Sequence, residues 1–175
     1  MKCKVIYSSK TGNTRKVAEA ILEKMPAGTS IASVDESPDL SGSDLLVIGY
    51  WIDKGTADAK ALKFIENVKS TKVVFFATLG AYPDSEHGKD CIKNGYKLFE
   101  DNGCVVVDSF LCQGAIDPKL MEWMKALPED HPHAPDDARR KRWAEAAKHP
   151  DVDDLANAQR WVCGVLDKVK KPCSC

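Results

Sequence analysis

Short apolar runs alternate with amphipathic stretches over residues 3–111 of this chain. Compact runs rich in β-branched residues predict buried strands, whereas apolar positions three or four residues apart predict helices that bury one face. The predicted strands cover residues 3–7, 29–34, 45–50, 72–78 and 104–111. Helices are expected after residue 14, over 56–67 and over 86–102. This alternation indicates an α/β fold built on a doubly wound, five-stranded parallel sheet.

Residues 113–150 interrupt this rhythm. Prolines are frequent in the segment, and the apolar pair Trp123 and Met124 precedes a basic run at 139–142. We predict a helical insert of two short helices joined by a proline-rich turn. After it, apolar residues return at helical spacing, which predicts a closing helix over 151–170 and leaves a tail at 171–175. We expect one domain spanning residues 1–175, because the chain is too short for two ordinary domains.

The charges of the chain are nearly balanced, with 25 lysines and arginines, 26 aspartates and glutamates, and a formal net charge of −1. Such a chain has no overall field that attracts nucleic acid or an anionic membrane. No apolar run approaches the roughly 18 residues of a membrane span, and the chain enters its first strand without a signal-peptide core. We therefore expect a cytoplasmic protein without nucleic-acid or membrane partners. The composition leaves the oligomeric state open.

The seven cysteines lie at apolar or tail positions without the spacing of a disulfide-rich scaffold. This distribution indicates reduced thiols. Cys173 and Cys175 differ from the others, because two thiols in a tail could bind a metal or oxidise. A passive tail is the more common outcome.

A hydroxyl-rich turn connects the first predicted strand with the first predicted helix. It consists of Ser8, Ser9, Lys10, Thr11, Gly12, Asn13 and Thr14. A helix start presents free backbone N–H groups and the positive end of the helix dipole, so this turn is a candidate phosphate site. Both the nucleoside-triphosphate loop G-x-x-x-x-G-K-S/T and the dinucleotide fingerprint G-x-G-x-x-G are absent. The turn suits one terminal phosphate held mainly by neutral donors, and an ordinary helix-capping turn is the alternative.

Two further loops are expected beside this turn, because ligands of an open parallel sheet lie beyond the carboxyl ends of its strands. One contains Tyr50, Trp51, Ile52, Asp53, Lys54 and Gly55, and the other contains Thr78, Leu79, Gly80 and Tyr82. Aromatic side chains are costly to leave in solvent unless they cover something flat. We predict that Trp51 and Tyr82 flank a flat ring of a ligand. Packing of either ring on a neighbouring loop is the alternative.

The turn resembles the FMN-phosphate loop of flavodoxins. Their pattern Ser/Thr-x-Thr-Gly-Asn-Thr is matched by Ser9, Thr11, Gly12, Asn13 and Thr14. The resemblance extends over residues 1–111 and the closing helix, and it implies the strand order 2-1-3-4-5 and FMN as the cofactor of the three loops. It also implies that the ring flanked by Trp51 and Tyr82 is the isoalloxazine of the flavin. The blocks at 49–58, 78–88 and 110–117 resemble a branch with an added C-terminal helical segment, which includes the BilS-type flavodoxins.

Two features of the insert each have a functional and a structural interpretation. His131 and His133, with aspartates nearby, could bind a metal. A solvated turn is the favoured interpretation, because a proline-rich loop presents ligands poorly. The basic run at 139–142 beside Trp143 could dock an acidic partner or the carboxylates of a tetrapyrrole. Such a run is more often the exposed face of a helix.

These observations lead to three functional hypotheses. The first is an FMN-binding electron-transfer protein that passes electrons between a reductase and an acceptor enzyme as its redox partners. The second is an NAD(P)H-dependent FMN oxidoreductase that reduces quinones or another small conjugated acceptor, including a tetrapyrrole-linked one. The third is a binding module that keeps the fold without a flavin.

Overall fold

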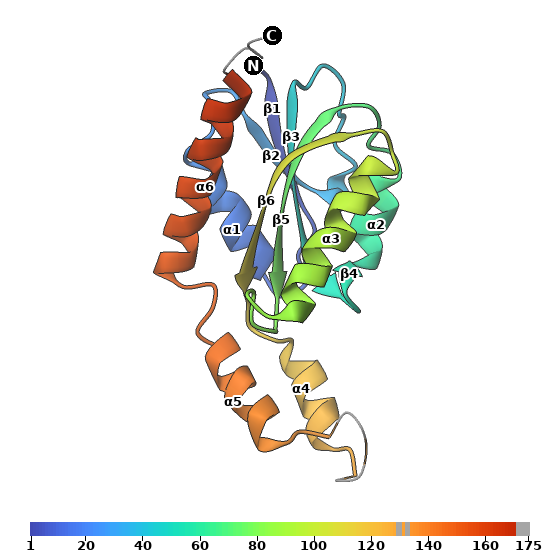
Figure 1. The fold of residues 1–175 in the computed structure, drawn as a ribbon, viewed down its shortest axis with the longest axis vertical. Helices are drawn as coiled ribbons and strands as arrows, with labels where there is room; N and C mark the ends of the chain where they lie inside the picture. The colour runs from blue at the N-terminus through green and yellow to red at the C-terminus, as the bar shows by residue number, and fades with distance from the viewer. Residues whose placement is uncertain (129–130, 132–133, 171–175) are drawn as a thin grey trace.

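Five long strands form one parallel sheet in the order β2-β1-β3-β5-β6 (Figure 1). The computed structural model describes residues 1–128, 131 and 134–170, so His133, Cys173 and Cys175 lie outside the described residues. The strands are β1 (Cys3–Tyr7), β2 (Ser30–Ser33), β3 (Leu45–Asp53), β5 (Lys72–Leu79) and β6 (Val105–Gln113). The predicted doubly wound sheet and its order are confirmed, with one additional short strand.

The two faces of the sheet carry separate hydrophobic clusters, because successive residues of a strand point to opposite faces. Val5 and Phe76 belong to one cluster, and Ile6 and Phe75 belong to the other. All four side chains are 0% exposed. Burial on both faces explains why the central strands are continuous apolar runs rather than alternating ones.

Helices cover both faces of the sheet (Figure 1). On one face α1 (Asn13–Leu22) packs beside α6 (Val152–Lys170). The other face is covered by α2 (Ala59–Ile65) and α3 (Glu86–Glu100), while a short 3-10 helix (Val34–Glu36) follows β2. Within the described residues, no helix has the length and apolar character that a membrane crossing needs.

The third predicted strand is longer in the structure, and the helix after it begins later. Lys54 and Gly55 have φ angles of +49° and +83° and form a two-residue turn. This turn leads the chain back as β4 (Thr56–Ala57), which pairs antiparallel with the end of β3. The prediction that a helix starts at Thr56 was therefore wrong. Asp58 caps α2 instead, because its side chain accepts hydrogen bonds from the N–H groups of Lys60 and Ala61.

Two short helices lie between β6 and α6, beyond the carboxyl ends of the strands (Figure 1). They are α4 (Pro118–Lys125) and α5 (Asp137–Ala146). Asp117 caps α4 by accepting from the N–H of Lys119, and Asp136 caps α5 by accepting from the N–H of Arg139. Local capping therefore starts both helices, while α4 itself buries no residue.

Candidate functional site

A cavity of about 780 Å³ lies at the carboxyl ends of β1, β3 and β5. This volume falls within the range of about 300–1,000 Å³ that is typical of ligand sites. Among the predicted binding residues, the cavity is lined by Lys10, Thr11, Asn13, Trp51, Ile52, Asp53, Thr78, Leu79, Gly80 and Tyr82. Residues of the three predicted loops therefore meet at one place, beyond the carboxyl ends of the strands.

The remaining predicted residues lie next to the cavity without lining it. These are Ser8, Ser9, Gly12, Thr14, Tyr50, Lys54 and Gly55. Ser8 is buried and donates to Asp58 Oδ1 at 2.8 Å, and the Thr14 and Thr78 hydroxyls are hydrogen-bonded at 2.9 Å. These buried bonds join the turn after β1 to α2 and β5, so they hold the turn in place.

Tyr50, Lys54 and Gly55 contact other parts of the protein rather than the cavity. Tyr50 is 0% exposed and stacks on Phe75 in the core, with ring centroids 5.9 Å apart. Lys54 and Gly55 make the hairpin between β3 and β4, and the Gly55 carbonyl accepts from Asn94 Nδ2 at 2.9 Å. The cavity wall after β3 is instead formed by Trp51, Ile52 and Asp53.

The turn after β1 presents several donors that the protein itself does not use. Gly12, with φ of +94°, is the N-cap residue of α1 and has no side chain with which to cap this helix. Ser9 Oγ accepts from the N–H groups of Gly12 and Arg15 at 3.2 and 3.3 Å, and Thr11 Oγ1 accepts from Asn13 Nδ2 at 3.2 Å. Both hydroxyls therefore keep their own proton for an external acceptor. Among the described residues, the N–H groups of Asn13 and Thr14 have no acceptor.

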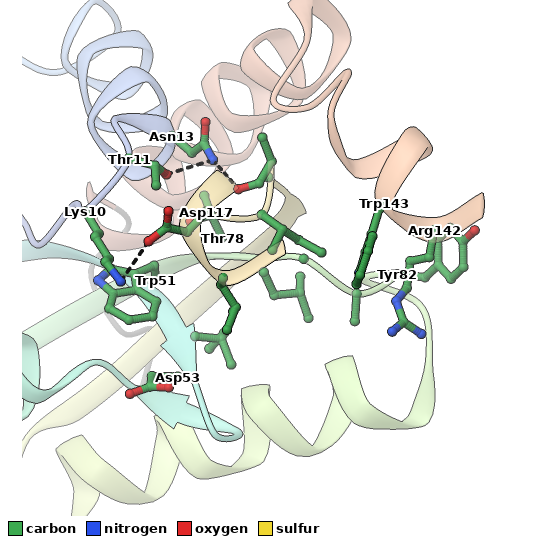
Figure 2. Close-up of a pocket in the computed structure, with 18 of the residues that line it drawn as sticks. Lys10, Thr11, Asn13, Trp51, Asp53, Thr78, Tyr82, Asp117, Arg142 and Trp143 are labelled. Carbon is green, nitrogen blue, oxygen red and sulfur yellow. Dashed lines mark hydrogen bonds and ion pairs between the residues drawn. The ribbon is translucent and has the colours of Figure 1, made fainter. Parts of the chain in front are cut away.

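Lys10 connects the turn to the first inserted helix. Its Nζ lies 2.8 Å from Asp117 Oδ2 and 5.6 Å from the centre of the Trp51 ring (Figure 2). The hydrogen bond between Lys10 and Asp117 raises the pKa of Lys10 and lowers the pKa of Asp117, and the attraction between the opposite charges shifts both pKa values in the same directions. Lys10 thus covers one face of Trp51 and holds the start of α4 against the turn.

The segment from β6 to α4 closes one side of the cavity. Asn13 Nδ2 donates to the Ala115 carbonyl at 2.9 Å, and the Gly114 N–H donates to the Leu79 carbonyl at 2.9 Å. A Cβ on Gly80 would lie 2.5 Å from Ile116 Cγ1, so only glycine lets Ile116 pack this closely. The backbone after β6 therefore contacts both the end of β5 and the turn after β1.

Sequence reasoning did not place residues of the insert on the cavity wall, although it considered the basic run at 139–142 beside Trp143 as a docking site. From this part of the chain, the wall includes Ile116, Leu120, Met124, Arg139, Arg142 and Trp143. The spacing of Leu120 and Met124, four residues apart on one helix, was the available signal. The basic run at 139–142 is divided by the structure: Arg139 and Arg142 line the cavity, whereas Arg140 and Lys141 are exposed.

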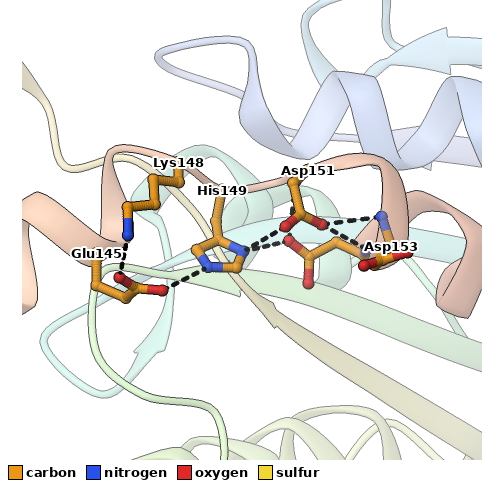
Figure 3. Close-up of polar contacts among 6 residues, drawn as sticks. Glu145, Lys148, His149, Asp151 and Asp153 are labelled. Carbon is orange, nitrogen blue, oxygen red and sulfur yellow. Dashed lines mark hydrogen bonds and ion pairs between the residues drawn. The ribbon is translucent and has the colours of Figure 1, made fainter.

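A histidine with acidic neighbours lies at the junction of α5 and α6 (Figure 3). His149 Nδ1 is 2.5 Å from Asp154 Oδ2 and 3.9 Å from Asp151 Oδ2, and its Nε2 is 3.6 Å from Glu145 Oε1. The hydrogen bond to Asp154 is the main cause that raises the pKa of His149. The His149 carbonyl accepts from the N–H of Ala115 at 2.9 Å, so this junction is tied to the cavity wall.

Three of these groups also have the composition of a cation site. The ligand atoms of His149, Asp151 and Asp154 lie within 4.8 Å of one another. Each carboxylate already accepts backbone N–H groups of this junction: Asp151 from Asp153 and Asp154, and Asp154 from Asp151. These hydrogen bonds explain the cluster without a cation, because the carboxylates hold the backbone between α5 and α6. For the histidine pair of the insert, His133 lies outside the described residues.

The chain is similar in sequence and in fold to known proteins. The family described as "Flavodoxin domain" matches residues 4–163. A curated relative, the "Flavodoxin-like domain-containing protein BilS" of Clostridioides difficile (strain CD3), is 30% identical over 177 residues, which cover 96% of this chain and 98% of the relative.

Solved structures share the same fold at low sequence identity. Oxidised Flavodoxin 2 from Bacillus cereus has a TM-score of 0.60 at 15% identity, and the match covers 96% of this chain and 99% of that one. A flavoprotein from Lactobacillus acidophilus NCFM, solved in complex with FMN, has a TM-score of 0.51 at 16% identity, with 70% of this chain and 97% of that one covered.

Proposed function

Because this chain belongs to the flavodoxin domain family, we propose that it binds FMN in the cavity and carries electrons between a reductase and an acceptor enzyme. One observation carries the proposal. The N-terminus of α1, with the free N–H groups of Asn13 and Thr14, lies at one part of a cavity whose wall also includes two aromatic rings, Trp51 and Tyr82. FMN carries a phosphate group that suits the helix N-terminus and a flat ring that suits the two aromatic side chains.

The donors of the turn fit the phosphate of FMN. The hydroxyls of Ser9 and Thr11 and the N–H groups of Asn13 and Thr14 would hold it, since all of them are free to donate. The dipole of α1 adds to the attraction of an anion. Thr14 takes part through its backbone, because its hydroxyl is already paired with Thr78.

The two aromatic side chains fit the ring system. Tyr82 is 43% exposed, and Trp51 is half-buried with Lys10 over one face of its ring. Covering the open surface of both rings removes apolar area from water, which favours binding of a flat ligand. Bound FMN would supply the redox chemistry, and the protein would position the ring and exclude water from part of it.

Titration of the protein with FMN, followed by visible absorbance and calorimetry, tests the proposal. Riboflavin is the matched ligand because it lacks only the phosphate. Charge-assisted hydrogen bonds contribute about 1.5–3 kcal/mol each, so FMN should bind at least about a hundredfold more tightly than riboflavin. Thr11→Val should weaken FMN by about tenfold and leave riboflavin unchanged. Equal affinity for the two ligands, or no uptake of FMN, would contradict the proposal.

A second function is favoured by the extent of the cavity. Its wall continues beyond Trp51 and Tyr82 to side chains of α4 and α5, which offers room for a small molecule beside the flavin. An NAD(P)H-dependent FMN oxidoreductase acting on quinones or other conjugated acceptors would use such room. Rapid mixing of the FMN-loaded protein with NADPH separates the two functions. Fast loss of flavin absorbance without any added reductase would support the oxidoreductase.

We also propose a cytoplasmic location and a redox partner protein. The described cysteines are free thiols, with Cys3, Cys91, Cys104 and Cys112 buried and Cys163 exposed. Free thiols persist in a reducing compartment. Fractionation of cells that produce the protein, with detection of the chain in each fraction, checks the location.

A further inference from the structure

The cavity has two parts of different chemistry. Around the turn after β1 its wall carries hydroxyl, amide and paired charged groups, whereas around α4 and α5 it carries apolar side chains and two arginines. Figure 2 shows Lys10, Trp51 and Asp53 at one side of the cavity and Tyr82, Arg142 and Trp143 at the other. The groups that could hold a phosphate are therefore separated, within the cavity, from the two arginines and the apolar side chains of α4 and α5.

Arg142 differs from the other lysine and arginine side chains of the cavity wall. Lys10 is paired with Asp117, and Arg139 donates to the Ala134 carbonyl at 2.8 Å. In the part of the chain that the structure describes, Arg142 has neither a carboxylate partner within 4.0 Å nor a hydrogen bond, although its side chain is partly buried. A half-buried guanidinium without an acceptor is suited to receive an anion.

Apart from Arg139 and Arg142, the side chains that α4 and α5 place on the cavity wall are apolar or aromatic. Trp143 is 6% exposed, and Leu120 is 46% exposed although it lies on the cavity wall. Met124, which also lines the cavity, has a flexible side chain that adapts to irregular shapes. The cavity carboxylates lie elsewhere, with Asp117 neutralised by Lys10 and Asp53 on the Trp51 side. An anion near Arg142 would therefore meet little repulsion.

We propose that α4 and α5 form a second ligand site next to the flavin, which binds a small planar aromatic carboxylate. Arg142 binds the carboxylate through its guanidinium, and Leu120, Met124 and Trp143 pack on the aromatic frame. The division of the basic run supports this assignment, since Arg142 faces the cavity while Arg140 is 59% exposed and paired with Asp137. The position beside a flavin rests on the proposed function, whereas the carboxylate site itself rests on the insert.

The test uses 2-naphthoate as the probe and its neutral amide, 2-naphthamide, as the matched compound. Each is titrated into FMN-loaded protein by calorimetry. A charge-assisted hydrogen bond from Arg142 should make naphthoate bind at least about tenfold more tightly than naphthamide. Arg142→Gln should remove this preference, and Arg142→Lys should keep part of it because it retains the charge without the planar fork.

Arg140→Gln is the control, because it removes the same charge from the exposed face of α5. It should leave the affinity for naphthoate within about twofold of the unchanged protein. Equal weakening by the two glutamine variants would overturn the site, since it would reflect only net charge. A loss of FMN affinity in Arg142→Gln as large as the loss of naphthoate affinity would also overturn it, because Arg142 would then belong to the cofactor site.

Failure of this proposal can be separated from failure of the proposed function. If the protein takes up no FMN, the proposed function fails, and naphthoate is then titrated into the protein alone with tryptophan fluorescence as the readout. Binding that depends on Arg142 but not on Arg140 would still support a carboxylate site in the insert. No binding of naphthoate in either form of the protein would overturn it.

Discussion

The parallel sheet and the α4–α5 pair line the same cavity but bury very different amounts of surface. Every residue of β5 after Lys72 is buried, whereas α4 buries none and α5 buries Trp143 and Ala146. Segments with few buried contacts open more easily than core strands. One wall of the cavity is therefore formed by the rigid sheet and the predicted phosphate turn. The other wall, formed by α4 and α5, is held in place by a few specific contacts.

These contacts can be named, and they lie at the ends of the α4–α5 pair. At the start of α4, Asp117 pairs with Lys10, and after α5, His149 is surrounded by three carboxylates. In between, Trp143 is the largest buried side chain of α5. Mutations in the sheet should therefore affect unfolding of the whole molecule, and mutations at these contacts should affect mainly the cavity wall.

The largest expected effect is that of Phe76→Ala in the sheet. Phe76 is 0% exposed, and truncation of a buried phenylalanine costs about 3–5 kcal/mol through lost burial and the resulting cavity. The exposed tryptophan of α4 is the control: Trp123 is 52% exposed, so Trp123→Ala should change stability by no more than about 0.5 kcal/mol. Urea unfolding followed by circular dichroism gives both values. Similar losses in the two variants would contradict the contrast between the regions.

The sheet could be predicted because its central strands are buried on both faces. Continuous apolar runs such as that around Phe75 and Phe76 have few alternatives in a chain of this length. The end of β3 was not predicted, because it depends on positive φ angles at Lys54 and Gly55, which redirect the chain into β4. A two-residue hairpin with lysine at its first position is a weak pattern.

The cavity could be predicted only on the side of the sheet. The turn after β1 and the loops after β3 and β5 were placed together by the rule for parallel strands, and the structure brings some residues of each onto one wall. The opposite wall depends on how α4 and α5 fold back over the strand ends. No local pattern encodes that direction, since it follows from contacts between distant residues such as Asn13 with Ala115 and Lys10 with Asp117.

Trp143→Ala should have a smaller and more local effect than Phe76→Ala. Burial of a large apolar side chain contributes about 1.5–3 kcal/mol, so the opening free energy of α5 should fall by about 2 kcal/mol. Hydrogen exchange measures this change residue by residue. Protection should fall for the amides of α5 and stay unchanged for those of β5. A uniform fall over both elements would show that α5 unfolds only together with the sheet.

His149→Gln should destabilise the protein at low pH but not at high pH. His149 faces Asp151, Asp154 and Glu145, and Lys148 pairs with the same glutamate. Its pKa is raised above the ordinary 6.5, mainly by Asp154. The protonated form is therefore stabilised in the folded state, and this stabilisation is complete below pH 6.5 and is lost as the pH rises through the raised pKa.

This charge-assisted hydrogen bond should contribute about 1.5 kcal/mol, the lower end of the usual range, because both side chains remain partly exposed to water. Urea unfolding at about pH 5.5 and about pH 9 should show the variant less stable at the lower pH and nearly equal to the unchanged protein at the higher one. Asp154→Asn is the matched variant, and its combination with His149→Gln should add little further loss. A stability difference that is the same at both pH values would exclude the ion pair as its cause.

The smallest expected effects concern Lys10, which has two possible partners in the cavity. In the structure it is paired with Asp117 at 2.8 Å, and both side chains belong to the wall where we propose the phosphate of FMN. If Lys10 also attracts that phosphate, Asp117 competes for its charge. Lys10→Gln should then weaken FMN binding by less than about fivefold, because an exposed charge in water is strongly screened.

Asp117→Asn should change FMN affinity in the opposite direction. The amide keeps the shape of the side chain and can still accept the N–H of Lys119, but it releases the charge of Lys10 toward the phosphate. We expect tighter binding by up to about threefold and a steeper loss of affinity with added salt, measured by calorimetry at two ionic strengths. If both variants weaken FMN binding to the same extent, Lys10 acts only by holding α4 against the turn, and the phosphate is bound by the neutral donors alone.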